Sequence, residues 1–88
     1  TSVTTWDFIN VSGQNSKATT ATLIINAGIG YTYGDNCKVN GATIANGVKW
    51  VGGNPPPATN NDDILTFSIV RDSTGVTRVY CSSSINII

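Results

Sequence analysis

The sequence predicts an all-β protein: a small antiparallel β-sandwich or barrel-like module of six to eight short strands. The chain contains twelve Thr, ten Ile and eight Val, and β-branched side chains fit a pleated strand but lose rotamer freedom in a helix. Residues that favour helices are nearly missing, since there are two Leu, no Met and no Glu. Short alternating runs separated by Gly, Asn, Asp and Pro point to the same class.

The N-terminal half predicts three strand regions. The first covers residues 6–11 and stops at the polar residues 12–16. The second, residues 18–26, has the sequence ATTATLIIN, whose alternation places Ile24 and Ile25 on opposite faces. We expect this Ile-rich end to be buried on both faces. The third region, residues 31–39, is interrupted by a polar stretch at 34–36.

The middle of the chain consists mainly of turns. Asn40-Gly41 and Asn46-Gly47 are dipeptides that tolerate positive φ, and each lies between short apolar stretches, so two tight turns are predicted. A short strand at 48–51 leads into residues 52–57, GGNPPP. Because proline has no amide donor, it is excluded from the interior of a sheet. We expect this segment to be an extended surface arm.

The C-terminal part contains the clearest strand, residues 63–71. In it, Leu65, Phe67 and Ile69 alternate with Ile64, Thr66, Ser68 and Val70. A hairpin turn follows at 72–75, where Gly75 suits the left-handed conformation. The chain returns over 76–81, and residues 85–88 predict one more strand after three serines.

The length fixes the scale of the core. We expect residues 1–88 to form a single β-module, and a chain of this size buries only roughly 60–65% of the surface that its unfolded form exposes. Since the chain has no initiator Met, we expect it to be a piece of a longer protein.

Composition also excludes several classes of function. Without His there is no Ser-His or Cys-His nucleophile pair and no imidazole metal ligand. The net charge is zero and charged residues make up 11%, so the basic surface of a nucleic-acid binder is missing. The apolar runs are far shorter than the roughly 20 residues of a membrane-spanning helix. We therefore expect no catalytic or metal site, no cofactor, no nucleic acid and no membrane insertion.

The two cysteines leave their pairing open. A bridge between Cys37 and Cys81 would close a loop of 43 intervening residues and contribute about 4 kcal/mol according to chain-entropy theory. However, two cysteines do not make a disulfide-rich scaffold, and free Cys is a common small core residue.

An oxygen-rich cluster, NNDD, occupies residues 60–63. Such side chains can hold Ca²⁺, but neighbours on a strand point to opposite faces, which does not suit a paired acid/base role. We interpret the cluster as a polar turn leading into the next strand.

Tyr31 and Tyr33 are the candidate binding residues. They lie two apart, hence on one face of a strand, where their rings could stack on a sugar with Asp35 as a polar anchor. The alternative is a half-buried wall without a ligand.

Several stretches together resemble one family. They are VKWVGGNPP at 48–56, NDDILTF at 61–67, the turn at 72–75, and the earlier segments 8–13 and 21–26. These stretches resemble the terminal β-module of bacteriophage tail-fibre and related virion structural proteins, of the kind common in marine and cyanobacterial phages. The resemblance covers roughly residues 6–81. The sequence departs from the family at 78–80, where the family often has a Trp-Tyr pair, and it is richer in proline at 55–57.

The resemblance implies a non-enzymatic virion structural module, assembled in the host bacterial cytoplasm, that contributes to homotrimer assembly and to recognition of a host cell-surface glycan. It also implies that both cysteines are thiols. Two alternative functions are a capsid decoration or cement protein and a stand-alone carbohydrate-binding β-sandwich. Other virion proteins are further possible partners, as a decoration protein would require. We expect structural roles for Trp50, Gly52, Gly53, Pro55, Phe67 and Gly75.

Overall fold

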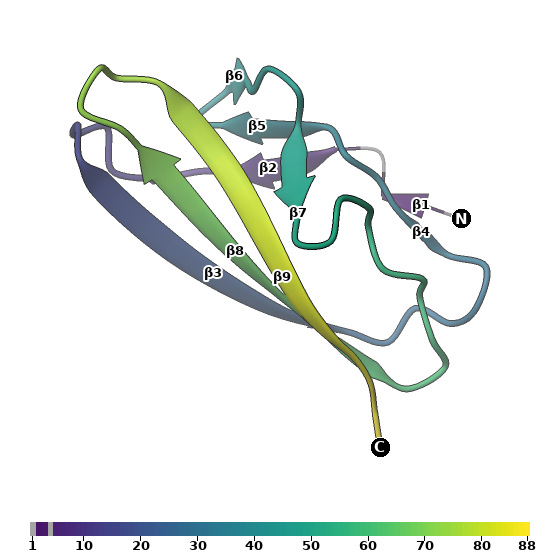
Figure 1. The fold of residues 1–88 in the computed structure, drawn as a ribbon. Coiled ribbons are helices and arrows are strands. Elements are labelled where there is room, and N and C mark those ends of the chain that lie inside the picture. The colour runs from purple at the N-terminus through teal and green to yellow at the C-terminus, as the bar shows by residue number, and fades with distance from the viewer. Residues whose placement is uncertain (1, 4) are drawn as a thin grey trace.

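The computed structural model describes residues 2–3 and 5–88. This part of the chain is all β and forms two layers with the core between them (Figure 1). The larger layer is a four-stranded sheet in the order β3-β8-β9-β7. Its strands are β3 (Lys17–Ile25), β8 (Asp62–Arg71), β9 (Thr77–Ile87) and β7 (Val48–Trp50). The predicted all-β sandwich class is confirmed.

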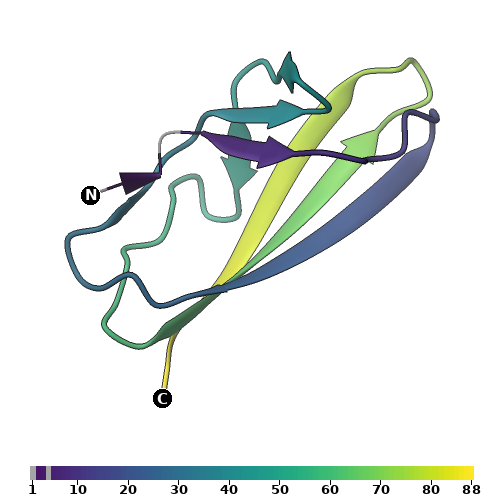
Figure 2. The same cartoon turned by 180° about the vertical axis from the view of Figure 1, so that it is seen from behind.

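The second layer, seen from behind in Figure 2, is made of shorter strands. A three-stranded sheet has the order β2-β5-β6, and β1 pairs with β4 beside it. The bounds are β1 (Ser2–Val3), β2 (Trp6–Phe8), β4 (Thr32–Tyr33), β5 (Cys37–Val39) and β6 (Ala42–Thr43). Because Val3 pairs with Tyr33 and Trp6 pairs with Cys37, the two pairs follow one another along the chain with one extra residue on the β4–β5 side.

The sheets are mixed, which corrects the expectation of antiparallel pairing throughout. Three pairs are parallel: β1 with β4, β2 with β5, and β7 with β9. In each pair a long connection separates the partners, so the chain can return in the same direction. Alternation of apolar residues reports the faces of a strand and carries no information about its direction.

The core lies on the inner face of the larger sheet. Leu65 and Phe67 of β8 are fully buried. The Phe67 ring is the centre of an aromatic cluster, with the Trp6 ring at 5.0 Å and the Phe8 ring at 5.1 Å between centroids. Trp50 covers the same ring from β7, at 6.3 Å. Side chains from both layers therefore meet at one residue.

Both Asn-Gly dipeptides form the predicted tight turns. Asn40 and Gly41 have φ values of +50° and +84°, and Asn46 and Gly47 have +65° and +61°. A Cβ at Gly47 would lie 2.2 Å from the backbone oxygen of Asp35, so only glycine fits at this approach.

The β8–β9 hairpin is stabilised by Asp72. Its Oδ1 accepts hydrogen bonds from the Thr74 hydroxyl at 2.7 Å, the Thr74 amide at 2.9 Å and the Val76 amide at 3.0 Å. The hydrogen bond from the Thr74 hydroxyl, followed by that from the Val76 amide, holds the pKa of the Asp72 carboxyl well below its usual range. Gly75 has the predicted positive φ, +89°.

Two strand predictions are wrong. The side chain of Ile24 is 68% exposed, because no element of the described chain packs on that face of β3. Residues 85–87 do not form a separate strand but continue β9, which runs unbroken through the three serines. Serine is small enough to alternate within a ladder, and the irregularity falls later, at the bulge near Asn86, which has φ +59°.

Cys37 and Cys81 are both free and buried, in agreement with the expectation of thiols. Burial raises the pKa of both groups, and that of Cys81 reaches about 11. Both side chains therefore act as small apolar core residues.

Candidate functional site

Tyr31 and Tyr33 lie on one face, as the alternation predicted, with ring centroids 5.7 Å apart in an edge-to-face arrangement. Their exposure differs. Tyr33 is 1% exposed, so it has no free ring face for a sugar, which corrects its proposed stacking role. Tyr31 is half-buried and reaches the surface, and its binding role stays a prediction.

The hydroxyl of Tyr33 is held by a buried carboxylate. It donates to Asp63 Oδ2 at 2.8 Å. Thr59 donates its amide to Oδ2 at 2.9 Å and its hydroxyl to Oδ1 at 2.7 Å, and the Asn86 amide donates to Oδ1 at 3.0 Å. The side chains and backbone of three separate segments therefore meet at one carboxylate that is fully buried.

This arrangement determines the ionisation of both groups. Burial alone would raise the pKa of Asp63, but the hydrogen bonds from Asn86, Thr59 and Tyr33 outweigh it and hold the pKa at about 2. Burial, together with the same contact, raises the pKa of Tyr33 to about 12. Near neutral pH Asp63 is charged and Tyr33 is neutral, so the pair is a structural contact with no proton to exchange.

Sequence reasoning missed the role of Asp63, although a signal was present. Asp63 shares the strand face of Leu65 and Phe67, which are both buried. A carboxylate that continues a buried face must find donors. The NNDD cluster was therefore correctly interpreted as a turn and strand start, but its fourth residue is part of the core.

The other members of the cluster are also structural. Asn60 Oδ1 accepts from the Ile29 amide at 3.0 Å, and Asn61 Nδ2 donates to Asn86 Oδ1 at 2.7 Å. The Asn26 amide group donates to Asp62 at 3.3 Å. In the described part of the chain, no group of three or more His, Cys, Asp or Glu residues could hold a metal ion.

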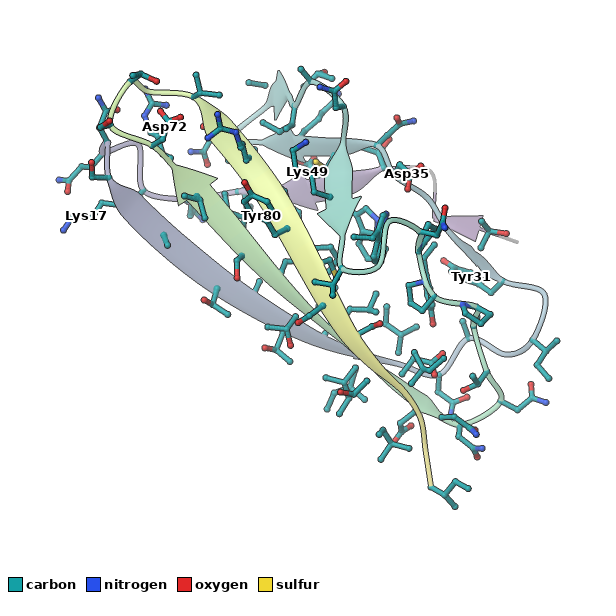
Figure 3. The ribbon with its side chains drawn as sticks, viewed as in Figure 1. Lys17, Tyr31, Asp35, Lys49, Asp72 and Tyr80 are labelled. Carbon is teal, nitrogen blue, oxygen red and sulfur yellow. The ribbon has the colours of Figure 1, made fainter. Side chains whose placement is uncertain are left out.

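Asp35 makes a structural contact that the amino-acid sequence does not indicate. Its Oδ1 accepts the indole Nε1–H of Trp50 at 2.7 Å, and its backbone oxygen accepts from the Val48 amide at 2.7 Å. Trp50 itself is only 8% exposed. Asp35 therefore ties β7 to the loop before β5, and Figure 3 shows it at the same end of the molecule as Tyr31.

The proline arm forms an open groove with Tyr31. Gly52 and Gly53, with φ of +90° and +91°, turn the chain away after β7. The groove then lies between residues 29–33 and residues 55–58 and has a volume of about 430 Å³. No charged residue lines it, so it presents an aromatic ring and pyrrolidine rings. Such a surface suits the apolar face of a sugar.

No protein-family model, curated protein or solved structure matches this chain. Within the described residues there is no helix long and apolar enough to cross a membrane.

Proposed function

We propose that this chain is a non-catalytic structural module of a bacteriophage tail fibre or another virion appendage, that it associates as a homotrimer, and that its Tyr31 groove contacts a host-surface glycan. The resemblance of residues 6–81 supports the virion assignment. The proposed assembly is supported by one observation: no element of the described chain packs on the outer face of the larger sheet.

The central rows of this outer face carry hydroxyl and apolar side chains, while Lys49, Arg78 and Asp62 lie around them. Its register places Thr22 beside Thr66 and Thr66 beside Ser82, and in the next row Ile24 lies beside Ile64. Ile24 is 68% exposed, and Ile87 at the end of β9 is 44% exposed. Contact between copies across these rows would bury apolar and hydroxyl groups without desolvating a charge.

The edge of the sheet adds a second reason for association. β3 is the last strand in the sheet order, and the backbone groups on its free side can pair with another chain. A small domain with a thin core gains stability when copies cover such surfaces. The family resemblance implies that the copies are arranged with threefold symmetry.

The native mass tests the assembly. We expect light scattering at micromolar concentration to give three times the mass of one chain. Ile24→Asp should give monomers, because it places a charge in the contact. The matched control is Ile29→Asp, since Ile29 is 75% exposed on a loop away from the sheet, and its mass should stay that of the trimer. A monodisperse monomer of the unaltered protein would refute the proposal and favour the stand-alone carbohydrate-binding alternative.

The glycan contact has its own prediction. Tyr31→Ala should reduce binding to immobilised bacterial surface polysaccharides at least tenfold, about the effect of 1.4 kcal/mol, because it removes the aromatic wall of the groove. Ile9→Ala, altered at a residue that is 69% exposed elsewhere, should bind normally. If Tyr31→Ala keeps the trimer mass and the polysaccharide binding, the groove is not the contact.

A further inference from the structure

A second cavity is lined by Arg71 and Thr77, which flank the β8–β9 hairpin. Figure 3 labels Asp72 of this hairpin, at the opposite end of the molecule from Tyr31. The cavity opens between the two layers and has a volume of about 190 Å³. Sites for drug-sized ligands have roughly 300–1,000 Å³, so this cavity suits a ligand of the size of one sugar ring.

The interior of the cavity is apolar. Val39 and Ile69, which are 7% and 2% exposed, belong to the core, and the half-buried Val11 and Ile44 pack against it. Polar residues also line the cavity, among them Ser12 and Thr77. The cavity therefore combines an apolar surface with hydrogen-bonding groups, as ligand sites do.

The loop that forms one wall is held in place. Asn40 Nδ2 donates to the Val11 backbone oxygen at 2.8 Å, and the Val11 amide donates to Asn40 Oδ1 at 3.0 Å. The backbone amide of Asn40 also donates to the Phe8 oxygen at 2.7 Å. These bonds join the loop to the β5–β6 turn, so this wall is formed before a ligand arrives.

Arg71 is the charged residue of the lining. Its Nε donates to Asn15 Oδ1 at 2.8 Å, and Asn15 donates in turn to the Ser73 oxygen at 3.3 Å. Among the described residues Arg71 forms no ion pair. The guanidinium is therefore oriented through Nε, while its terminal nitrogens stay available for a planar anion.

Two positively charged residues on neighbouring strands support an anionic ligand. The strand register places Lys17 directly opposite Arg71, and like charges opposite each other destabilise a sheet. The nearby Asp72 carboxylate forms an ion pair with Arg78 at 2.9 Å and accepts a hydrogen bond from Thr74 in its own turn. Asp62 and Asp63 lie at the start of β8, whereas Arg71 ends it. An anion bound at Arg71 would relieve this repulsion.

We propose that the cavity binds a small organic carboxylate of the size of one sugar ring, with uronic acids as the best-fitting class. The terminal nitrogens of Arg71 hold the carboxylate, and Lys17 adds positive potential. The ring lies on the apolar wall, and the Ser12 and Thr77 hydroxyls bind its hydroxyl groups. This goes beyond the proposed function, because it depends on neither trimer assembly nor the Tyr31 groove.

Titration with glucuronate, monitored by amide chemical shifts, tests the proposal. Glucose is the neutral ligand with the same ring. We expect saturable shifts at Asn40, Ile69 and Thr77 with glucuronate, and at least tenfold weaker binding of glucose. Arg71→Gln should weaken glucuronate binding at least tenfold. Lys49→Gln removes one exposed positive charge from β7 and is the charge-matched control, which should bind normally.

One further variant and two further ligands identify the class of ligand. Lys17→Gln leaves the Asn15 contact of Arg71 intact and should weaken glucuronate about threefold or more. Benzoate binding as tightly as glucuronate, with the same dependence on Arg71, supports a carboxylate site for aromatic acids instead of sugars. Inorganic phosphate binding in place of both carboxylates overturns the proposal. So does equal binding of glucose and glucuronate, or an equal loss in Lys49→Gln and Arg71→Gln.

Discussion

Asp63→Ala is expected to lower the free energy of unfolding by about 3–5 kcal/mol, a large part of the stability of a small domain. The carboxylate accepts hydrogen bonds from Tyr33, Thr59 and Asn86. Its removal leaves these buried donors unpaired, which costs more than the bonds themselves contribute. Denaturant unfolding measures the difference.

Two variants provide controls. Tyr33→Phe removes one of the donors and should cost about 1–2 kcal/mol. Asp62→Ala alters the neighbouring carboxylate, which is exposed, and should change stability by no more than about 0.5 kcal/mol. Equal stability of Asp63→Ala and Asp62→Ala would contradict the central role of Asp63.

The same carboxylate makes stability depend on acid pH. Its pKa is about 2 in the folded protein, against 3.8 for an unperturbed Asp side chain, so the unfolded chain takes up the proton first as pH falls. The contribution is complete above about pH 4 and is lost as pH falls through about 2. Asp63→Asn should reduce this acid dependence. Asp72→Asn provides the comparison, because the lowered pKa of Asp72 also makes stability depend on pH in the acid range.

Trp50→Ala should cost about 3–5 kcal/mol through the cavity that it leaves. The indole is 8% exposed and packs edge-on against Phe67 at 6.3 Å. Its Nε1–H also donates to Asp35 at 2.7 Å. In a domain of this size each kcal/mol lowers Tm by about 4–8 °C, so circular dichroism should record a fall of more than about 10 °C.

The ring and the hydrogen bond of Trp50 can be separated. Trp50→Phe keeps an aromatic ring but loses the bond to Asp35, and it should be more stable than Trp50→Ala. Val51→Ala changes the next residue, which is 74% exposed, and should leave Tm nearly unchanged. An unaltered Tm of Trp50→Ala would show that the indole does not support the core.

Much of the local structure could be predicted from the sequence. Alternation along β8 identified Leu65, Phe67 and Ile69 as one face, and all three are buried. The turn residues Asn40, Gly41 and Gly75 adopt the expected positive φ, because steric limits on φ act within a residue and its neighbours. The common face of Tyr31 and Tyr33 was predictable for the same local reason.

Other features were decided only by contacts between distant segments. Ile24 and Ile69 are both apolar strand residues, yet one is exposed and the other buried, since burial depends on whether another layer covers the face. Tyr33 meets Asp63 across 30 positions of sequence, and Trp50 meets Asp35 across a turn that only Gly47 permits. Sterics and side-chain periodicity were enough to predict most of the strands, their faces and their turns, although the separate strand at 85–88 and the burial of Ile24 were predicted wrongly. Strand direction, the uncovered surface, the Tyr31 groove and the cavity at Arg71 depend on the tertiary structure, because each of these requires residues that the chain brings together only when it folds.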